Sequence, residues 1–206
     1  MLILFLPGVL GVCNPDGNGH IAIPSSVTFI PSYAYQGCSL TSVFIPDTVT
    51  SIGEGAFESS SLQAVVIPDS ITSIASDTFL GTGLQSVRIP NSVTTIGGSA
   101  FQFCTNMETA IIGTAVRDIE YNAFQSCESL RSISIPNSVT AIGNSAFASC
   151  TSLTSIILPA SVAIGSGAFS SCGCPEELFV EAPSCTGVSL VAFPFATSAL
   201  SRQSAM

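Results

Sequence analysis

Cysteine is the residue type that could most readily do chemistry in this 206-residue chain, which contains eight of them. Five recur three residues after an aromatic side chain, namely Cys38, Cys104, Cys127, Cys150 and Cys172. The corresponding position elsewhere holds Ser60 or Thr82. A small, semi-polar packing position explains these substitutions better than pairwise disulfides do. We therefore expect buried free thiols at this position, behaving as small hydrophobic side chains.

The other three cysteines, Cys13, Cys174 and Cys185, lie outside that column. In an oxidising compartment they could form a staple at one end of the fold, and our hypothesis pairs Cys174 with Cys185. The spacing of Cys172 and Cys174 is not that of a zinc site, and no second cysteine pair or histidine pair accompanies it.

His20 is the only histidine, so no histidine-based metal cluster is available. Ser-His-Asp or Cys-His catalysis would have to recruit this one residue, whereas an exposed polar residue before the first strand is the simpler interpretation. The acidic residues are expected to be scattered singly, as at Asp47, Glu54, Asp69 and Glu120, rather than paired at matching positions of adjacent coils, which does not favour a calcium cage or a carboxylate pair. We expect no catalytic residues, no metal and no cofactor.

The composition predicts a folded chain with few charges. Hydrophobic residues make up 47% and charged residues 8%, and a net charge of -9 arises from 13 acidic residues against four basic ones. A phosphate backbone would be repelled, so nucleic acid is not expected as a partner. The same charge counts against an anionic membrane surface.

The sequence repeats every 22 or 23 residues, and this period sets the positions of the five recurring cysteines described above. Ile-Pro begins at Ile23, Ile45, Ile67, Ile89 and Ile135, with Ile112 and Leu158 at the same position of their repeats. An aromatic column keeps the same period: Tyr35, Phe57, Phe79, Phe101, Phe124, Phe147 and Phe169. Such a period indicates a solenoid, in which stacked repeats bury a continuous core. The aromatic column is therefore expected to be structural.

The composite motif LxxVxIPxSVTxIGxxAFxxC resembles the BspA-like class of leucine-rich repeat, found in many bacterial and protist surface proteins. The resemblance covers about residues 18–183. Departures are Gly113 after Ile112, Arg117 after Val116, and Pro175 where a leucine should stand. The resemblance implies a leucine-rich-repeat horseshoe or right-handed coil of about seven repeats, and adhesion to matrix or host-type proteins.

Within each repeat, LxxVxI predicts a short strand whose alternate residues face the core, and the proline ends the strand because it has no N–H. Val-Thr-x-Ile predicts a second extended segment, and glycines such as Gly53 and Gly97 are expected to permit the turn after it. Gly-x-x-Ala-Phe is expected to form a tight helical or 3₁₀ turn that points its aromatic inward.

Three regions are predicted: a cap or signal-like segment at 1–17, the solenoid at 18–183, and a C-terminal cap with a frayed tail at 184–206. Met1 to Cys13 is apolar but too short and interrupted to span a bilayer, so no membrane insertion is expected. A secretion signal is favoured for it over an edge cap or the remnant of a longer chain, although no basic residues precede it.

The outward residues of the LxxVxI strands are the candidate partner-binding face. They are Phe44, Val66, Arg88, Ile111, Ser134, Ile157 and Phe179, flanked by Ser42, Ala64, Ser86, Thr109, Ser132 and Ser155. Free drift of surface positions in a strand is the competing explanation.

We therefore expect a non-catalytic protein-binding module, with secretion or the cell surface favoured over the cytoplasm. One alternative is an intracellular scaffold or a detached repeat segment of a larger receptor. A minor alternative, an ice- or surface-binding solenoid, rests on the column Thr28, Thr50, Thr72, Thr94 and Thr140, which Arg117 and Ala163 interrupt.

Overall fold

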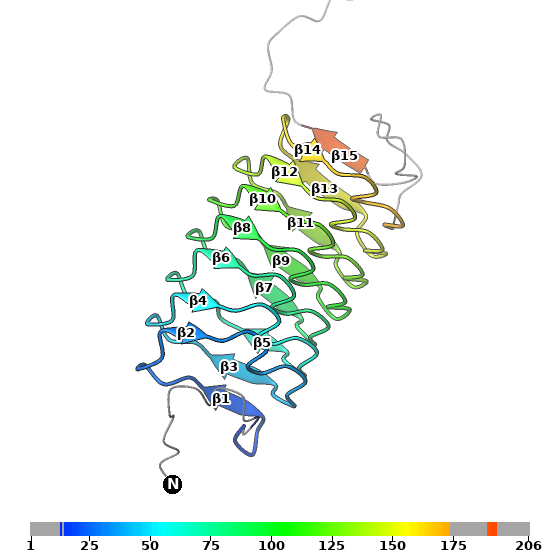
Figure 1. Cartoon of the computed structure of the whole chain (residues 1–206). Coiled ribbons are helices and arrows are strands. Elements are labelled where there is room, and N and C mark those ends of the chain that lie inside the picture. Colours follow the sequence, from blue (N-terminus) through cyan, green and yellow to red (C-terminus); the bar gives the residue numbers. More distant parts are fainter. Residues whose placement is uncertain (1–12, 14, 174–188, 193–206) are drawn as a thin grey trace, which may run out of the picture.

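The computed structural model describes residues 13, 15–173 and 189–192, which form a stack of coils built only from short parallel strands and turns (Figure 1). Each coil contributes one strand to each of two faces, and the next coil repeats them one step along the stack. The predicted solenoid is confirmed. Pro175 and the three predicted residues Cys174, Phe179 and Cys185 lie outside the described residues.

The first face carries the LxxVxI segments, followed by strand β15 (Ser189–Ala192) from outside the predicted repeats, where Val191 and not Phe179 pairs with Ile157. Its strands are β1 (His20–Ala22), β3 (Ser42–Phe44), β5 (Ala64–Val65), β7 (Ser86–Arg88), β9 (Thr109–Ile111), β11 (Ser132–Ser134), β13 (Ser155–Leu158) and β15 (Ser189–Ala192). Pairing is parallel from β1 through β3 to β5, and again from β7 to β15, but β5 and β7 are not paired. In the proline-bearing coils the strand ends before Pro, as predicted.

The second face carries the Val-Thr-x-Ile segments. Its strands are β2 (Phe29–Ile30), β4 (Ser51–Ile52), β6 (Ser73–Ile74), β8 (Thr95–Ile96), β10 (Asp118–Ile119), β12 (Ala141–Ile142) and β14 (Ala163–Ile164). Here β2 pairs with β4, the pairing is interrupted between β4 and β6, and it continues from β6 to β14. Both sheets therefore have one gap, and both gaps adjoin the coil that contains β5 and β6.

The Gly-x-x-Ala-Phe segment is a succession of tight turns, each closed by a hydrogen bond to the third residue back, and its aromatic is buried as predicted. These turns do not join into a continuous helix in the described residues. Successive N–H groups alternate in direction: that of Tyr33 donates to the next coil at Glu54 O (2.9 Å), and that of Ala34 donates within its own coil to Pro31 O (3.3 Å). Each coil also places two residues at positive φ, as at Tyr33 (59°) and Gly37 (66°). Two left-handed residues per coil interrupt any helix.

Four of the seven second-face strands are followed by glycine, at Gly53, Gly97, Gly143 and Gly165. We expected these glycines to permit the turn, but their role is close contact between coils. Gly53 and Gly97 have no positive φ. A Cβ on Gly53 would lie 2.4 Å from Ser32 N, and one on Gly97 would lie 2.7 Å from Ser76 N. Only glycine lets the backbones of adjacent coils approach this closely.

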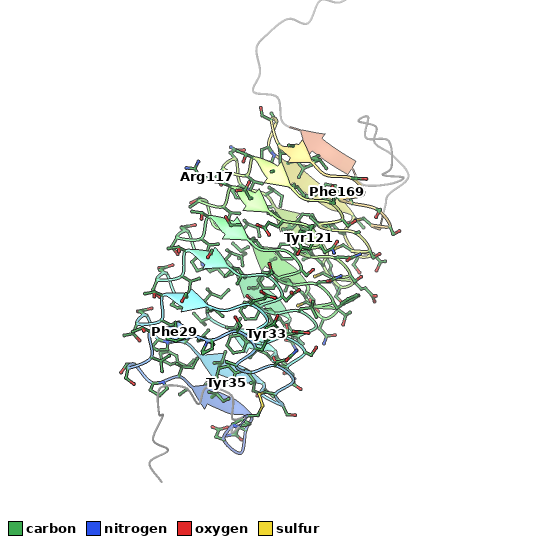
Figure 2. All side chains as sticks on the ribbon, in the orientation of Figure 1. Phe29, Tyr33, Tyr35, Arg117, Tyr121 and Phe169 are labelled. Atoms are coloured by element: carbon green, nitrogen blue, oxygen red, sulfur yellow. A yellow bond between two sulfur atoms is a disulfide. The ribbon has the colours of Figure 1, made fainter. Side chains whose placement is uncertain are left out.

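The core contains a continuous ladder of parallel aromatic rings. Consecutive rings from Tyr35 to Phe169 have centroids 5.1–5.5 Å apart and interplanar angles of 2–11°. Figure 2 shows Tyr35 and Phe169 at opposite ends of this stack. All seven rings are buried, which confirms the structural role predicted for the column. Each buried ring contributes about 1.5–3 kcal/mol relative to an exposed one.

Phe101 and Phe103 provide a matched test of the ladder, because Phe101 is 0% exposed and Phe103 is 50% exposed two residues away. Phe101→Ala should lower the free energy of unfolding by about 3–5 kcal/mol, since it leaves a cavity between two stacked rings. Phe103→Ala should change it by less than about 1 kcal/mol. Urea denaturation of both variants measures the difference, and equal losses would contradict the ladder as a source of stability.

Ser60 and Ser92 should respond to alanine with opposite signs. The buried Ser60 hydroxyl has no hydrogen-bond partner, whereas the Ser92 hydroxyl donates to Ile71 O at 2.6 Å. Ser60→Ala removes a desolvated polar group and should stabilise the fold by about 1 kcal/mol, while Ser92→Ala should destabilise it by a similar amount. The same denaturation experiment applies, and a loss of stability in Ser60→Ala would show that its hydroxyl is bonded in solution.

Candidate functional site

The candidate partner-binding face lies on the sheet of odd-numbered strands, where alternation turns every second side chain outward. Four of its large apolar side chains are strongly exposed: Phe44 (56%), Val66 (76%), Ile111 (57%) and Ile157 (48%). Arg88 and Ser134 are exposed as well, while the residue before each stripe position points into the core or is half-buried. The sequence prediction of outward orientation thus holds for every described member.

Strand register places four of these residues in one line along the stack. Arg88 pairs with Ile111, Ile111 with Ser134, and Ser134 with Ile157. Beyond the unpaired step, Phe44 pairs with Ala22 and Val66 follows β5. We call this set of outward residues on the first face the apolar stripe, comprising Phe44, Val66, Arg88, Ile111, Ser134 and Ile157.

Small side chains flank the apolar stripe at the first residue of each strand. Ala64, Ser86, Thr109 and Ser132 are exposed, and they leave the stripe side chains standing above their surroundings. Ser42 is half-buried, and its Oγ lies 2.9 Å from His20 Nδ1. His20 is therefore the half-buried first residue of β1, and not an exposed residue before it as expected.

A depression of about 360 Å³ opens beside the apolar stripe where β5 and β7 are unpaired. Its lining combines apolar and charged side chains: Asp47, Val65, Val66, Ile67, Pro68, Asp69, Arg88 and Pro90. The expectation that the acidic residues are not paired at matching positions of adjacent coils was wrong for Asp47 and Asp69. Their separation of 22 residues, one full repeat, was the signal that places them in adjacent coils.

A disulfide joins Cys13 to Cys38, with the two Cα atoms 5.3 Å apart. The expectation that all five column cysteines are free thiols was therefore wrong at Cys38. This cysteine belongs to the first coil, where the chain entering the stack brings Cys13 within bonding distance. Cys13 does staple one end, as one of the three cysteines outside the column was expected to do. The hypothesised Cys174–Cys185 pair lies outside the described residues.

The remaining column cysteines form a ladder of thiols that donate hydrogen bonds to the coil before them. Cys104 Sγ donates to Phe79 O and Cys127 Sγ to Phe101 O, both at 3.2 Å. Cys150 and Cys172 continue the pattern at 3.1 Å. Burial raises the pKa of Cys104 to about 11, against a smaller lowering by hydrogen bonds with Thr82, and burial also raises the pKa of Cys127 and of Cys150 well above the ordinary value of a thiol. These thiols are protonated and packed.

Two tyrosines, in coils far apart along the stack, are exposed outside the apolar stripe and were not predicted as surface features (Figure 2). Tyr33 is 45% and Tyr121 is 54% exposed. Tyr33 Oη donates a 2.6 Å hydrogen bond to Glu54, which raises the pKa of Tyr33 to about 12. A Cβ on Gly98 would lie 2.4 Å from the Tyr121 ring, so this ring rests on bare backbone. Both tyrosines therefore contact the neighbouring coil, Tyr33 through Glu54 and Tyr121 through Gly98, and pack on the surface of the stack.

The described part of the chain contains no group of three or more His, Cys, Asp or Glu residues that could hold a metal ion. Within the same residues, no helix has the length and apolar character required to cross a membrane.

Stacked parallel coils with an aromatic core and an exposed strand face define a leucine-rich-repeat solenoid. A model of the BspA type leucine rich repeat region matches the chain in six copies, over residues 18–127 and 72–194. The chain belongs to this family. Proteins of the leucine-rich-repeat class are generally non-catalytic and their repeats suggest protein interaction.

Solved structures of bacterial proteins share this fold. The leucine-rich-repeat protein TpLRR of T. pallidum is 32% identical, with a TM-score of 0.50 over 68% of this chain and 57% of that chain. The pneumococcal vaccine antigen PcpA is 16% identical, with a TM-score of 0.61 over 79% of this chain and 62% of that chain, and so shows the fold alone. The chain therefore spans about three fifths of each of these two proteins. None of the curated proteins compared with the chain matches it.

The cysteine assignments predict a defined pattern of reactivity. At pH 8, Cys104, Cys127 and Cys150 should not react with Ellman's reagent in the native protein, because burial and a raised pKa suppress the thiolate. They should react on unfolding in urea, when the pKa returns to its ordinary value. Cys13 and Cys38 should react only after reduction. The exposed position of Ser132→Cys supplies a reactive control, and modification of native Cys127 at the rate of that control would contradict the buried ladder.

Proposed function

We propose that this chain is a non-catalytic protein-binding module that contacts its partner through the apolar stripe. The observation that carries the proposal is the exposure of Phe44, Val66, Ile111 and Ile157 on one face of the stack. Ile111 and Ile157 lie in one register-aligned line with Arg88 and Ser134. Large apolar side chains gathered on one face are unfavourable in water, and such patches mark interaction sites. Solenoids use this extended face for binding.

The proposed setting is the cell surface or the secreted fraction. The Cys13–Cys38 disulfide supports it, because such bonds persist in oxidising compartments and are rare in the cytosol of mesophiles. Similarity to a pneumococcal vaccine antigen is consistent with this setting through the shared fold. An intracellular scaffold would instead contain Cys13 and Cys38 as reduced thiols, so alkylation of the protein isolated from its source cells distinguishes the two.

The threonine column gives little support to ice or surface binding. The hydroxyls of Thr50, Thr94 and Thr140 donate 3.2 Å hydrogen bonds to the backbone carbonyl of the preceding coil. Arg117 interrupts the column at the edge of the stack (Figure 2). Hydroxyls already committed to the protein are poorly suited to an external lattice, and absence of thermal hysteresis would remove this alternative.

A photo-crosslinking amino acid placed at position 111 tests the proposed function directly. Crosslinking on source cells should yield a specific protein adduct from position 111, on the apolar stripe, and none from position 94, which is exposed immediately before strand β8 of the second face. Ile111→Glu should then weaken binding of the identified protein by about tenfold or more, as expected when a buried apolar anchor is replaced by a charge. Equal adducts from positions 111 and 94, or unchanged affinity of Ile111→Glu, would refute the stripe as the binding face.

A further inference from the structure

The depression beside the apolar stripe results from a local departure from the repeat. Strand β5 contains two residues, whereas its neighbours β3 and β7 contain three, and β5 does not pair with β7. Val66 therefore lies just beyond the end of β5, and at 76% it is the most exposed of the large hydrophobic side chains described. The depression thus lies where the strand ladder of the first face is interrupted.

The lining of the depression has two chemical parts. Val65, Ile67, Pro68 and Pro90 supply apolar surface, and the side chain of Val66 adds to it. Asp47 and Asp69 are exposed on adjacent coils at matching positions, each two residues after the Ile-Pro isoleucine. A volume of about 360 Å³ is sufficient for one large side chain, since whole small-molecule sites begin near this size.

Arg88 is the one cation in this lining, against two carboxylates. A partner group near Asp47 and Asp69 therefore meets a negative local charge, and the net charge of -9 gives the long-range field the same sign. An acidic partner segment would be repelled by both. A basic segment would gain from both, and such complementarity favours association rate and specificity.

We propose that the depression receives an aromatic or aliphatic side chain of the partner, flanked by Lys or Arg residues that contact Asp47 and Asp69. This proposal rests on the proposed function. The apolar surface takes the anchor and the two carboxylates select its neighbours. The partner motif is therefore a short basic–apolar–basic segment of a protein.

NMR titration of the ¹⁵N-labelled full chain with the peptide acetyl-Ala-Lys-Phe-Lys-Ala-amide tests this motif. The amide signals of Val65, Val66 and Ile67 should shift. A peptide with Glu in place of both Lys residues should produce no shift, and one with Ser in place of Phe should bind at least about tenfold more weakly.

A double variant tests the role of the carboxylates. Asp47→Asn with Asp69→Asn should weaken binding of the Lys-Phe-Lys peptide by about tenfold or more, because two charge contacts are lost. The matched control, Asp118→Asn with Glu128→Gln, removes the same number of charges from β10 and from a turn, and should leave the affinity within about twofold. If both double variants lost affinity for the peptide equally, the loss would come from the change in net charge alone, and the proposal would be overturned.

Binding of the Glu-Phe-Glu peptide at these amides, shifts confined to other residues, or no shift with any peptide would also overturn it. These results are separable from the proposed function. A partner crosslinked from position 111 whose affinity is unchanged by the Asp47→Asn and Asp69→Asn substitutions would refute the basic–apolar–basic motif and leave the binding module intact.

Discussion

The fold depends on one constraint: each coil must satisfy its backbone hydrogen bonds and cover its apolar side chains by lying on the next coil. The turns donate forward, as from Phe57 N to Thr78 O, and the segments at the strands donate in both directions, as from Thr94 N to Thr72 O and from Ile89 N to Ile111 O. Stacking at this fixed spacing also brings the aromatic rings to 5.1–5.5 Å. Backbone bonds and core packing therefore require the same period, and neither sheet could exist in an isolated coil.

The repeat made the core predictable because inward positions in a stack must contain similar side chains in every coil. The aromatic column and the strand before each proline follow from that rule, and both were predicted correctly. The glycine at position 53 was assigned to the right place for the wrong reason, since sequence shows which residue recurs but not how near another backbone lies. The left-handed residues were missed because serine, aspartate, tyrosine and phenylalanine all occupy them.

Features that occur once in the stack were harder to predict. Strand alternation was enough to place the apolar stripe on the surface, from Phe44 to Ile157. The Cys13–Cys38 bond could not be separated from the thiol column, because Cys38 matches that column in spacing and only the path of the entering chain distinguishes it. The depression depends on the early end of β5, and no residue in Val65 to Ile67 departs from the repeat motif strongly enough to indicate it.

The unpaired steps in the two sheets have a mechanical consequence. Around β5 and β6 the strand ladders are interrupted, yet Phe57 stacks on Phe79, Phe79 stacks on Phe101, and the turn segments remain hydrogen-bonded across the same coils. The strand ladders thus divide the stack into two blocks. At the junction between the blocks, the coils are held together by stacked rings and by the hydrogen bonds of the turns. We expect bending or twisting to be easiest at this junction. Elsewhere in the stack, the same motion would have to break the backbone hydrogen bonds between paired strands.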